Sequence, residues 1–300
     1  MGYDAIIVGG SFAGLSAAMQ LTRARRKILL VDAGEPRNRF AHASHGFLGQ
    51  DGVAPAEIMR LGLAQLSAYP TFDFFHGRAE SVEAIEEGFR LRLSDGCDVA
   101  GRRLVLATGV ADELPLASMQ PRWGVSVLHC PYCHGYEVRD RPIAVIANHP
   151  MAAHQGLLLP DWGPTTYCTQ GVFEPTSEEA AQLTARGVTI ERTPVVELLG
   201  EGQATRALRL ADGRELAIEA VFTAPKTRIA SPLAEQLGCA LAEGMTGLHI
   251  QVDPMQATTV AGVFAAGDAA QPMHNATLAS AAGVMAGVAA HRSLIVEEAA

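Results

Sequence analysis

Residues 5–14 read Ala5-Ile-Ile-Val-Gly-Gly-Ser-Phe-Ala-Gly14, a short apolar run followed at once by a glycine-rich turn. Leu15–Ala24 then has helical character, and Lys27–Val31 is a second apolar run that ends at Asp32. A strand, a glycine turn, a helix and a second strand in this order form a βαβ unit. The opening of the chain therefore predicts an α/β fold with a parallel sheet.

The turn has the residue types that a dinucleotide needs, although Ser11 occupies the second glycine position of the usual pattern. Gly9 permits the tight turn, Ser11 is small enough for a pyrophosphate to approach the backbone, and Gly14 allows the helix to pack closely on the strand. The N–H groups at the helix N-terminus favour phosphates, and Asp32 can accept hydrogen bonds from an adenosine ribose. The alternative is a glycine turn that binds nothing. The expected nucleotide-binding residues are Gly9, Gly10, Ser11, Phe12, Ala13, Gly14, Asp32 and Ala33.

A second copy of this plan follows in the middle of the chain. Pro142–Ile146 is another apolar strand, Ala152–Leu159 a helix-like stretch, and Thr165–Cys168 a further strand. Both copies also contain Leu-Arg-Leu followed by Asp-Gly, at residues 91–96 and 208–213. This self-similarity indicates an internal duplication of a dinucleotide-binding fold.

Two segments that contain proline, near residues 110–122 and 223–232, are candidate crossings between domains. After the second crossing the chain returns to the first type of sequence and ends in a long helix of small residues, from about Thr277 to Ser293. We therefore predict two Rossmann-like dinucleotide-binding domains. The first is split, at 1–113 and 228–300, and the second, at 114–227, is inserted into it.

Composition limits the classes of partner and compartment. The net charge of −9 argues against nucleic acid or an anionic membrane as a partner. The N-terminus has no basic region and reads as a first strand rather than an export signal. The longest apolar run, Ala276–Ala290, is shorter than the ~20 residues that a membrane span needs. We expect a cytoplasmic protein that binds neither nucleic acid nor a membrane.

Five cysteines are present, and two of them lie close together. Residues 129–134 read His129-Cys-Pro-Tyr-Cys-His134, so Cys130 and Cys133 form a Cys-x-x-Cys pair. The other three are scattered and are interpreted as structural: Cys97, Cys168 and Cys239.

The pair allows three interpretations. Cys-x-x-Cys-His is the attachment pattern of c-type haem, but that chemistry requires export. Zinc would need a second ligand pair to complete its site, so no metal is expected. A redox disulfide is favoured because Cys130 and Cys133 can close a small ring, and the neighbouring His134 can lower the thiol pKa and carry the proton.

The order of these features resembles the low-molecular-weight thioredoxin reductases over essentially the whole chain. Residues 130–137, Cys-Pro-Tyr-Cys-His-Gly-Tyr-Glu, are more similar to the dithiol oxidases that form the disulfides of gliotoxin, holomycin and romidepsin. The resemblance implies a homodimer in which Cys133 faces the flavin and Cys130 exchanges with the substrate. Thioredoxin reductases usually have Asp as the acid–base residue after the second cysteine, where this chain has His134.

Two further segments, Ala107-Thr108-Gly109 and Ala266-Gly267-Asp268, resemble the downstream fingerprints of flavoproteins with two dinucleotide domains. The resemblance implies FAD as the cofactor, with Asp268 bonded to the ribityl chain. The helix that begins near Thr277 would point its positive end at the pyrimidine end of the flavin, where reduced flavin carries negative charge. Other residues that the resemblance assigns to FAD are His45 beside the flavin, Arg37 and Asn38 at the adenosine end, and Val82 at the adenine.

The second copy lacks what a nicotinamide cofactor requires. Superposing its first strand on Ala5–Val8 places Ala147–Ala152 where Gly9–Gly14 stand, and none of the glycines is present. Thioredoxin reductases hold the 2′-phosphate of NADPH with a basic cluster after the next strand, whereas residues 168–174 contain no cation. The alternative is a divergent NADH site.

Without a nicotinamide, the simplest direction of electron flow is oxidation. A dithiol substrate, either a small molecule or a protein, would reduce the Cys130/Cys133 pair, and oxygen would reoxidise FAD to give peroxide. One alternative is a disulfide reductase fed by NAD(P)H or by a donor such as ferredoxin. Another is a flavin-bound redox sensor without turnover.

Overall fold

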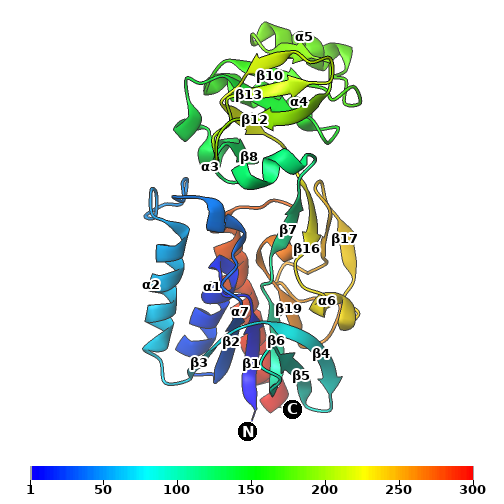
Figure 1. Cartoon of the computed structure of the whole chain (residues 1–300). Coiled ribbons are helices and arrows are strands. Elements are labelled where there is room, and N and C mark those ends of the chain that lie inside the picture. Colours follow the sequence, from blue (N-terminus) through cyan, green and yellow to red (C-terminus); the bar gives the residue numbers. More distant parts are fainter. Residues whose placement is uncertain (1, 300) are drawn as a thin grey trace. The chain divides into compact units, whose positions relative to one another are not determined.

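The computed structural model describes residues 2–299 of the chain, which form two compact units (Figure 1). The first unit comprises the chain up to Arg39, Pro55–Ala111 and the chain from Thr227 onward. The second comprises Phe40–Ala54 and Asp112–Lys226. The sequence interpretation assigned residues 40–54 to the first domain, but they pack with the second. The reason is that Phe40 contacts Gly124 and the apolar cluster around Trp123.

The first unit contains a seven-stranded sheet in which most neighbouring strands are parallel. Strands β1 (Tyr3–Val8), β2 (Ile28–Asp32) and β3 (Phe72–His76) pair in parallel, and β1 also pairs with β6 (Asp98–Leu106). The first half of β6 pairs with an antiparallel hairpin, and its second half pairs in parallel with the last strand. These remaining strands are β4 (Ala79–Ile85), β5 (Gly88–Leu93) and β19 (Val263–Ala265).

Helices α1 (Phe12–Arg23) and α7 (Ala276–Glu298) pack against each other on one face of this sheet, and α2 (Pro55–Ser67) contacts α1 (Figure 1). Gly283 and Gly287 of α7 lie against the backbone of Ala13 and Ala17. By length and composition alone α7 could cross a membrane. Its buried alanines, however, belong to the same apolar cluster as α1 and the sheet, which is how a core helix of a globular domain packs.

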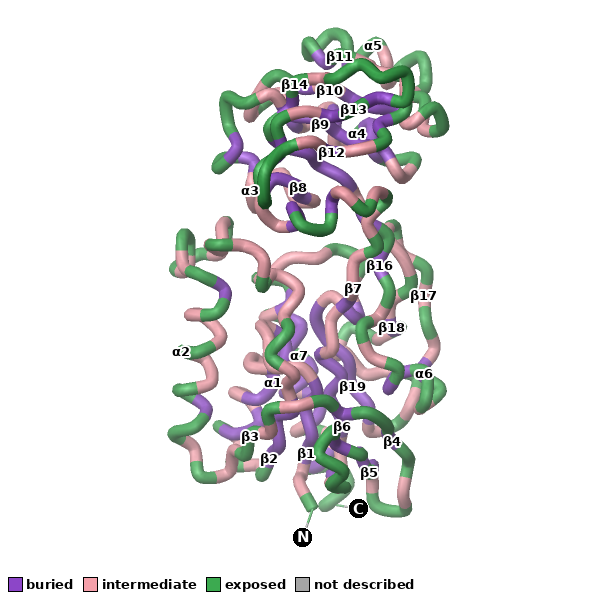
Figure 2. The backbone as a smooth tube through the Cα atoms, viewed as in Figure 1, coloured by how far each residue is buried: buried purple, intermediate pink, exposed green. Residues whose placement is uncertain are grey.

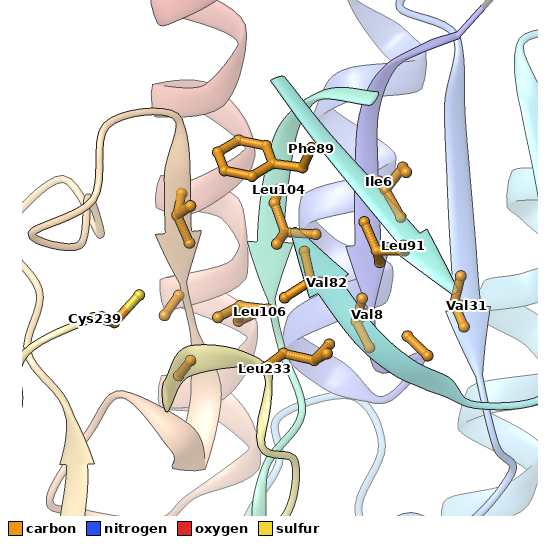
Figure 3. Packing of buried hydrophobic residues seen from close by; sticks show 14 of the residues in the cluster. Ile6, Val8, Val31, Val82, Phe89, Leu91, Leu104, Leu106, Leu233 and Cys239 are labelled. Atoms are coloured by element: carbon orange, nitrogen blue, oxygen red, sulfur yellow. The ribbon is translucent and has the colours of Figure 1, made fainter. Parts of the chain in front are cut away.

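A second apolar cluster covers the other face of the sheet (Figure 3). Val82 of β4 and Leu91 of β5 pack there with residues of β1 and β6 and with Leu233 of the short helix α6 (Leu233–Gln236). Cys239 is buried in this cluster and Cys168 in another, so both are structural. Burial raises the pKa of the Cys168 thiol to about 12, which keeps it protonated and unreactive.

The second unit contains a five-stranded parallel sheet in the order β11-β10-β9-β15-β8. Helices α4 (Ala152–Leu158) and α5 (Ser177–Ala185) pack with it, and a separate antiparallel sheet of three strands completes the unit. Figure 2 shows that burial follows the central strands in each unit. The parallel strands are β8 (Val127–Leu128), β9 (Ile143–Ile146), β10 (Thr165–Cys168), β11 (Thr189–Glu191) and β15 (Ala220–Phe222), and the antiparallel ones are β12 (Val195–Leu199), β13 (Ala207–Leu210) and β14 (Glu215–Ala217).

The chain passes between the units along two strands, β7 (Val110–Glu113) and β16 (Lys226–Ile229), which pair with each other. A small hairpin, β17 (Leu241–Glu243) and β18 (Leu248–Ile250), belongs to the first unit. Each unit therefore has a parallel sheet with helices packed on it, and the predicted α/β fold with an inserted second Rossmann-like domain is confirmed.

Candidate active site

The glycine turn after β1 has the backbone that sequence analysis predicts. Gly9 has a φ of +103°, and an added Cβ would lie only 2.2 Å from the Ala107 carbonyl oxygen. A Cβ on Gly14 would lie 1.7 Å from the Gly9 carbonyl oxygen. Any side chain at either position would break the turn, because these contacts are far shorter than van der Waals distances.

The three predicted flavin segments meet at this turn. Thr108 N lies 3.2 Å from the ideal Cβ position of Gly9, and Gly267 approaches Ala13 at the start of α1. The Ala266 N–H donates to the Leu106 carbonyl, which holds the Gly-Asp segment beside the end of β6. Segments that are far apart in the sequence thus surround the carboxyl ends of β1, β6 and β19, where open α/β sheets bind their ligands.

Asp32 closes the turn from the next strand. Its Oδ1 accepts a hydrogen bond from Gly10 N at 2.8 Å, and its Oδ2 accepts one from Gly34 N at 3.1 Å. Ala33 lies within this turn. Two backbone donors therefore fix the carboxylate at the end of β2, the position from which such residues bind a ribose.

The N-terminus of α1 can accept a pyrophosphate. Ser11 is the N-cap, but its side chain makes no capping hydrogen bond. The dipole of this 12-residue helix therefore favours an anion beside the turn. Together with the cradle at Gly9 and Gly14, this geometry fits the diphosphate of FAD.

Arg37, which the sequence interpretation assigned to the adenosine end, contacts the Gly-Asp segment. Its Nη1 lies 2.9 Å from Asp268 Oδ2 and 2.8 Å from His274 Nδ1. Arg37 thus reaches the carboxylate that was assigned to the ribityl chain. The neighbouring Asn38 is half-buried in the same 3-10 turn, Arg37–Phe40.

Helix α7 begins at Ala276 and is capped by Asn275, which sequence analysis missed. The Asn275 Oδ1 accepts hydrogen bonds from Thr277 N at 2.8 Å and Leu278 N at 3.3 Å. Asn is among the favoured N-cap residues, so the signal was present in the sequence. The cap means that the N–H of Thr277 itself is already engaged.

Two other predicted flavin residues have structural partners. The Val82 side chain is buried in the core, and its N–H donates to Gln236 Oε1 at 3.0 Å. The Gly109 carbonyl accepts from Ala230 N, which fixes the end of the Thr108 segment beside the second crossing.

In the second unit, Cys130 and Cys133 form a disulfide with their Cα atoms 5.3 Å apart. They lie at the start of the one-turn helix α3 (Pro131–His134), and Cys130 Sγ accepts from Cys133 N at 3.2 Å. Both cysteines are half-buried. A disulfide with partial access can exchange with an external thiol.

The surroundings of α3 are aromatic. Gly135 lies directly against the Trp162 ring, because an added Cβ would be 2.8 Å from it. The Tyr132 ring meets Trp162 edge to face at 5.8 Å and is itself exposed, as is Tyr136. The helix that carries the redox pair therefore packs against Trp162 and has two exposed tyrosine rings beside it.

His134 follows Cys133 directly and is half-buried. Burial lowers its pKa, the Glu137 carboxylate raises it, and a charge on His45 lowers it. Burial is the largest of these effects, so the neutral imidazole is favoured and can accept a proton.

His45, which sequence analysis placed beside the flavin, belongs to the second unit and contacts Glu137, with Nε2 to Oε1 at 3.5 Å. Glu137 was not among the predicted site residues. Its spacing of three from His134 puts the two on one side of a helical turn, which was a usable signal. Among residues 2–299 no cluster of three or more His, Cys, Asp or Glu could hold a metal ion.

The turn after β9 in the second unit differs from its counterpart after β1. Asn148 Nδ2 donates to the Ala224 carbonyl at 2.6 Å, and His149 Nδ1 accepts from Met151 N at 3.1 Å. Pro150 has no N–H to offer. Side chains of the chain itself therefore fill the place where a dinucleotide would meet bare backbone.

The sequence matches the family model described as pyridine nucleotide-disulphide oxidoreductase over residues 3–147 and 168–285. Thioredoxin reductase tcpT of Claviceps purpurea is 31% identical, and the match covers 98% of this chain and 95% of that protein. An oxidoreductase from Agrobacterium tumefaciens has a TM-score of 0.94 and 50% identity, over 99% of each chain. The structure of HlmI has a TM-score of 0.89 and 36% identity, over 99% of this chain and 94% of that one. The chain belongs to the pyridine nucleotide-disulphide oxidoreductase family and is a thioredoxin reductase-like, FAD-dependent thiol-disulfide oxidoreductase.

Proposed function

We propose that the protein oxidises a dithiol substrate to a disulfide through Cys130 and Cys133, with FAD as the internal electron acceptor and oxygen as the final one. The substrate is a small molecule or a protein that carries two neighbouring thiols. The net reaction converts one dithiol and one O2 into one disulfide and one H2O2, which balances electrons and protons.

The observation that carries this proposal is the filled turn after β9. In this turn the Asn148 side chain is bonded to the Ala224 carbonyl, and His149 Nδ1 takes the N–H of Met151, a backbone donor of the kind that a pyrophosphate would need. The family match omits residues 148–167, which contain this turn and the helix that follows it. Without electrons from a nicotinamide, the simplest source of electrons is the dithiol substrate itself.

The region after β10 supports the same direction. Gln170, in the stretch where related reductases carry cations, bonds both the N–H and the carbonyl of Val195 through its side-chain amide. The nearby Arg192 pairs with Glu174 at 3.1 Å. This stretch serves the fold of the second unit and offers no cation to a 2′-phosphate.

The chemistry at the pair follows from its neighbours. A substrate thiolate attacks Cys130 Sγ, the disulfide opens, and Cys133 leaves as a thiolate while His134 holds the substrate's proton. The second substrate thiolate then attacks the mixed disulfide at the substrate sulfur, which forms the product disulfide and releases Cys130 as a thiolate. When bound, FAD accepts the electron pair from the reduced cysteines and delivers it to oxygen.

A second candidate is a disulfide reductase, because tcpT is named a thioredoxin reductase. In that case electrons would enter from NAD(P)H at a divergent site or from a protein donor such as ferredoxin and leave through Cys130. A flavin-bound redox sensor would share the architecture without turnover. The net charge and composition favour a cytoplasmic protein without nucleic acid or membrane partners, and a homodimer is expected from the family resemblance.

The test is oxygen uptake by the purified yellow protein with dithiothreitol as the probe dithiol. We expect one H2O2 for each dithiol oxidised, with no added nicotinamide. A reductase would consume little oxygen under these conditions, and a sensor would be reduced once without continuing. Either result would refute the proposal.

A further inference from the structure

Near the half-buried His134, a row of ionisable side chains leads to the surface of the second unit. His45 Nε2 lies 3.5 Å from Glu137 Oε1, and His45 Nδ1 lies 3.5 Å from Asp51 Oδ1. The side chains are 22% exposed at His45, 37% at Glu137 and 71% at Asp51. Exposure thus increases from the imidazole to the outer carboxylate.

The loop 40–54 is built to hold His45 in this row. Ser44 and Val53 form a bridge, and Ser44 N donates to the Val53 carbonyl at 2.8 Å. Asp51 Oδ1 accepts from Gly46 N at 3.0 Å, which fixes the carboxylate beside the histidine. Gly46 in turn approaches the carbonyl of Tyr132 in α3. The loop is therefore pinned to itself and lies against the helix that carries the redox pair.

Glu137 follows His134 by three residues, and its Oε1 lies 3.5 Å from His45 Nε2. It sits in the 3-10 turn Tyr136–Val138 that directly follows α3. Its carboxylate raises the pKa of His134, whereas burial and His45 lower it. No other ionisable group contributes to that shift: His129 is turned to Trp123, with which its ring stacks at 5.7 Å.

A base at this position must pass on the proton that it accepts before it can accept another. Two thiol protons leave the sulfurs at the pair for each dithiol, and the same number is taken up from solvent when oxygen becomes H2O2. A half-buried imidazole can hold only one extra proton at a time. A carboxylate beside the ring stabilises the imidazolium and offers the proton a next acceptor.

We propose that Glu137 is the positioning residue for His134, and that Glu137, His45 and Asp51 carry the proton from His134 to solvent. This rests on the proposed role of His134 as the base of dithiol exchange. His45 connects the two carboxylates of the row, because its Nε2 faces Glu137 and its Nδ1 faces Asp51. It can accept a proton on Nε2 from the Glu137 side and release one from Nδ1 to Asp51.

The test follows the His134 titration by NMR in the oxidised holoprotein with ¹³C-labelled histidine, with His134→Gln to assign the signal. Glu137→Gln removes the charge that favours the imidazolium, so the His134 midpoint should move to lower pH. His45→Gln removes a like charge, so the midpoint should move to higher pH. Glu178→Gln, an exposed carboxylate on α5 far along the chain, should leave it unchanged.

Opposite shifts from Glu137→Gln and His45→Gln would support the row. An unchanged midpoint in Glu137→Gln would overturn it, since a purely structural Glu137 would not move that titration. Because the measurement uses the resting disulfide form without dithiol or oxygen, it stays readable even if the oxidase proposal fails.

The second measurement is kcat for the oxidation of dithiothreitol as a function of pH. A neutral His134 is needed, so kcat falls as pH drops through its pKa. Glu137→Gln should move this acid limb to lower pH and also reduce kcat at its plateau, and Glu137→Asp should restore part of the plateau. A plateau equal to that of the unaltered protein in Glu137→Gln would contradict a role in proton release.

Discussion

The turns after β1 and β9 occupy equivalent positions in the two Rossmann-like units, but their residues and hydrogen bonds differ. After β1, Gly9 and Gly14 pack against backbone carbonyls so closely that no Cβ fits, and Asp32 accepts a hydrogen bond from Gly10 N beside them. After β9, Asn148 and His149 make internal hydrogen bonds in the equivalent place. A Rossmann-like turn binds a dinucleotide only if its backbone donors are left for the ligand.

The second turn is stabilised by hydrogen bonds within the protein. Buried polar groups generally have hydrogen-bond partners, and in the second turn the chain supplies one for the Asn148 Nδ2 group and one for the Met151 N–H. The Asn148 amide ties the turn to Ala224 beyond β15, which holds two strand ends together.

The largest effect is expected from adding a side chain to the glycine turn after β1. Gly9→Ala puts a methyl group 2.2 Å from the Ala107 carbonyl oxygen at a φ of +103°. We expect a protein that binds no FAD or does not fold, measured as flavin released per chain on denaturation. Gly213→Ala is the control, because its φ is +88° but nothing lies within 4 Å. It should keep its FAD and lose about 1–2 kcal/mol of stability, and equal flavin content in both variants would refute the cradle.

The next largest effect is expected at the cysteine pair, through which electrons enter from the substrate in the proposed reaction. Cys130→Ser and Cys133→Ser should each abolish dithiol turnover. Cys130→Ser should leave a thiolate at Cys133 and a long-wavelength charge-transfer band that titrates with pH, whereas Cys133→Ser should have no such band. A band in Cys133→Ser alone would reverse the assigned roles of the two cysteines.

Removing the base should have a smaller effect. His134→Gln keeps the size and polarity of the side chain but cannot accept the thiol proton, so turnover should fall by roughly 10²–10⁴-fold. Stopped-flow reduction of the flavin by dithiothreitol measures this step directly. A near-normal rate of flavin reduction would mean that another group, His129 or His45, accepts the thiol proton.

The smallest effect is expected in the second turn itself. Asn148→Ala removes one hydrogen bond, to Ala224, and should cost about 1 kcal/mol of unfolding free energy by urea denaturation. Dithiol turnover and FAD content should not change, because this turn takes no part in the reaction. Asp32→Ala, the matched change beside the first turn, should weaken FAD binding, and a loss of turnover in Asn148→Ala would mean that the second turn still works.

Much of the fold could be predicted because its signals are local. The run from Ala5 to Gly14 identifies the βαβ unit, and the predicted helix at Leu15–Ala24 is observed as Phe12–Arg23. Helix α7 begins one residue before the predicted Thr277 and runs beyond Ser293 to Glu298, because its C-terminal turns carry charged residues that the small-residue pattern does not include. Errors of this kind affect helix ends and not architecture.

The remaining features depend on contacts between distant parts of the chain. Nothing near Phe40 in the sequence indicates that it packs on Gly124, so the loop 40–54 could not be assigned to the second unit. The same holds for Arg37, whose partner Asp268 is 231 residues away. Glu137 is the last residue of the 130–137 motif, but its contact with His45 could not be predicted from the sequence.

The most direct test of the central claim compares electron donors. The oxidised holoprotein is mixed without oxygen with dithiothreitol, with NADH or with NADPH, and the flavin absorbance is followed in time. We expect dithiothreitol to bleach the flavin rapidly and both nucleotides to act far more slowly, because the second turn is filled. Efficient bleaching by either nucleotide at micromolar concentration would contradict the account and identify the chain as a conventional reductase.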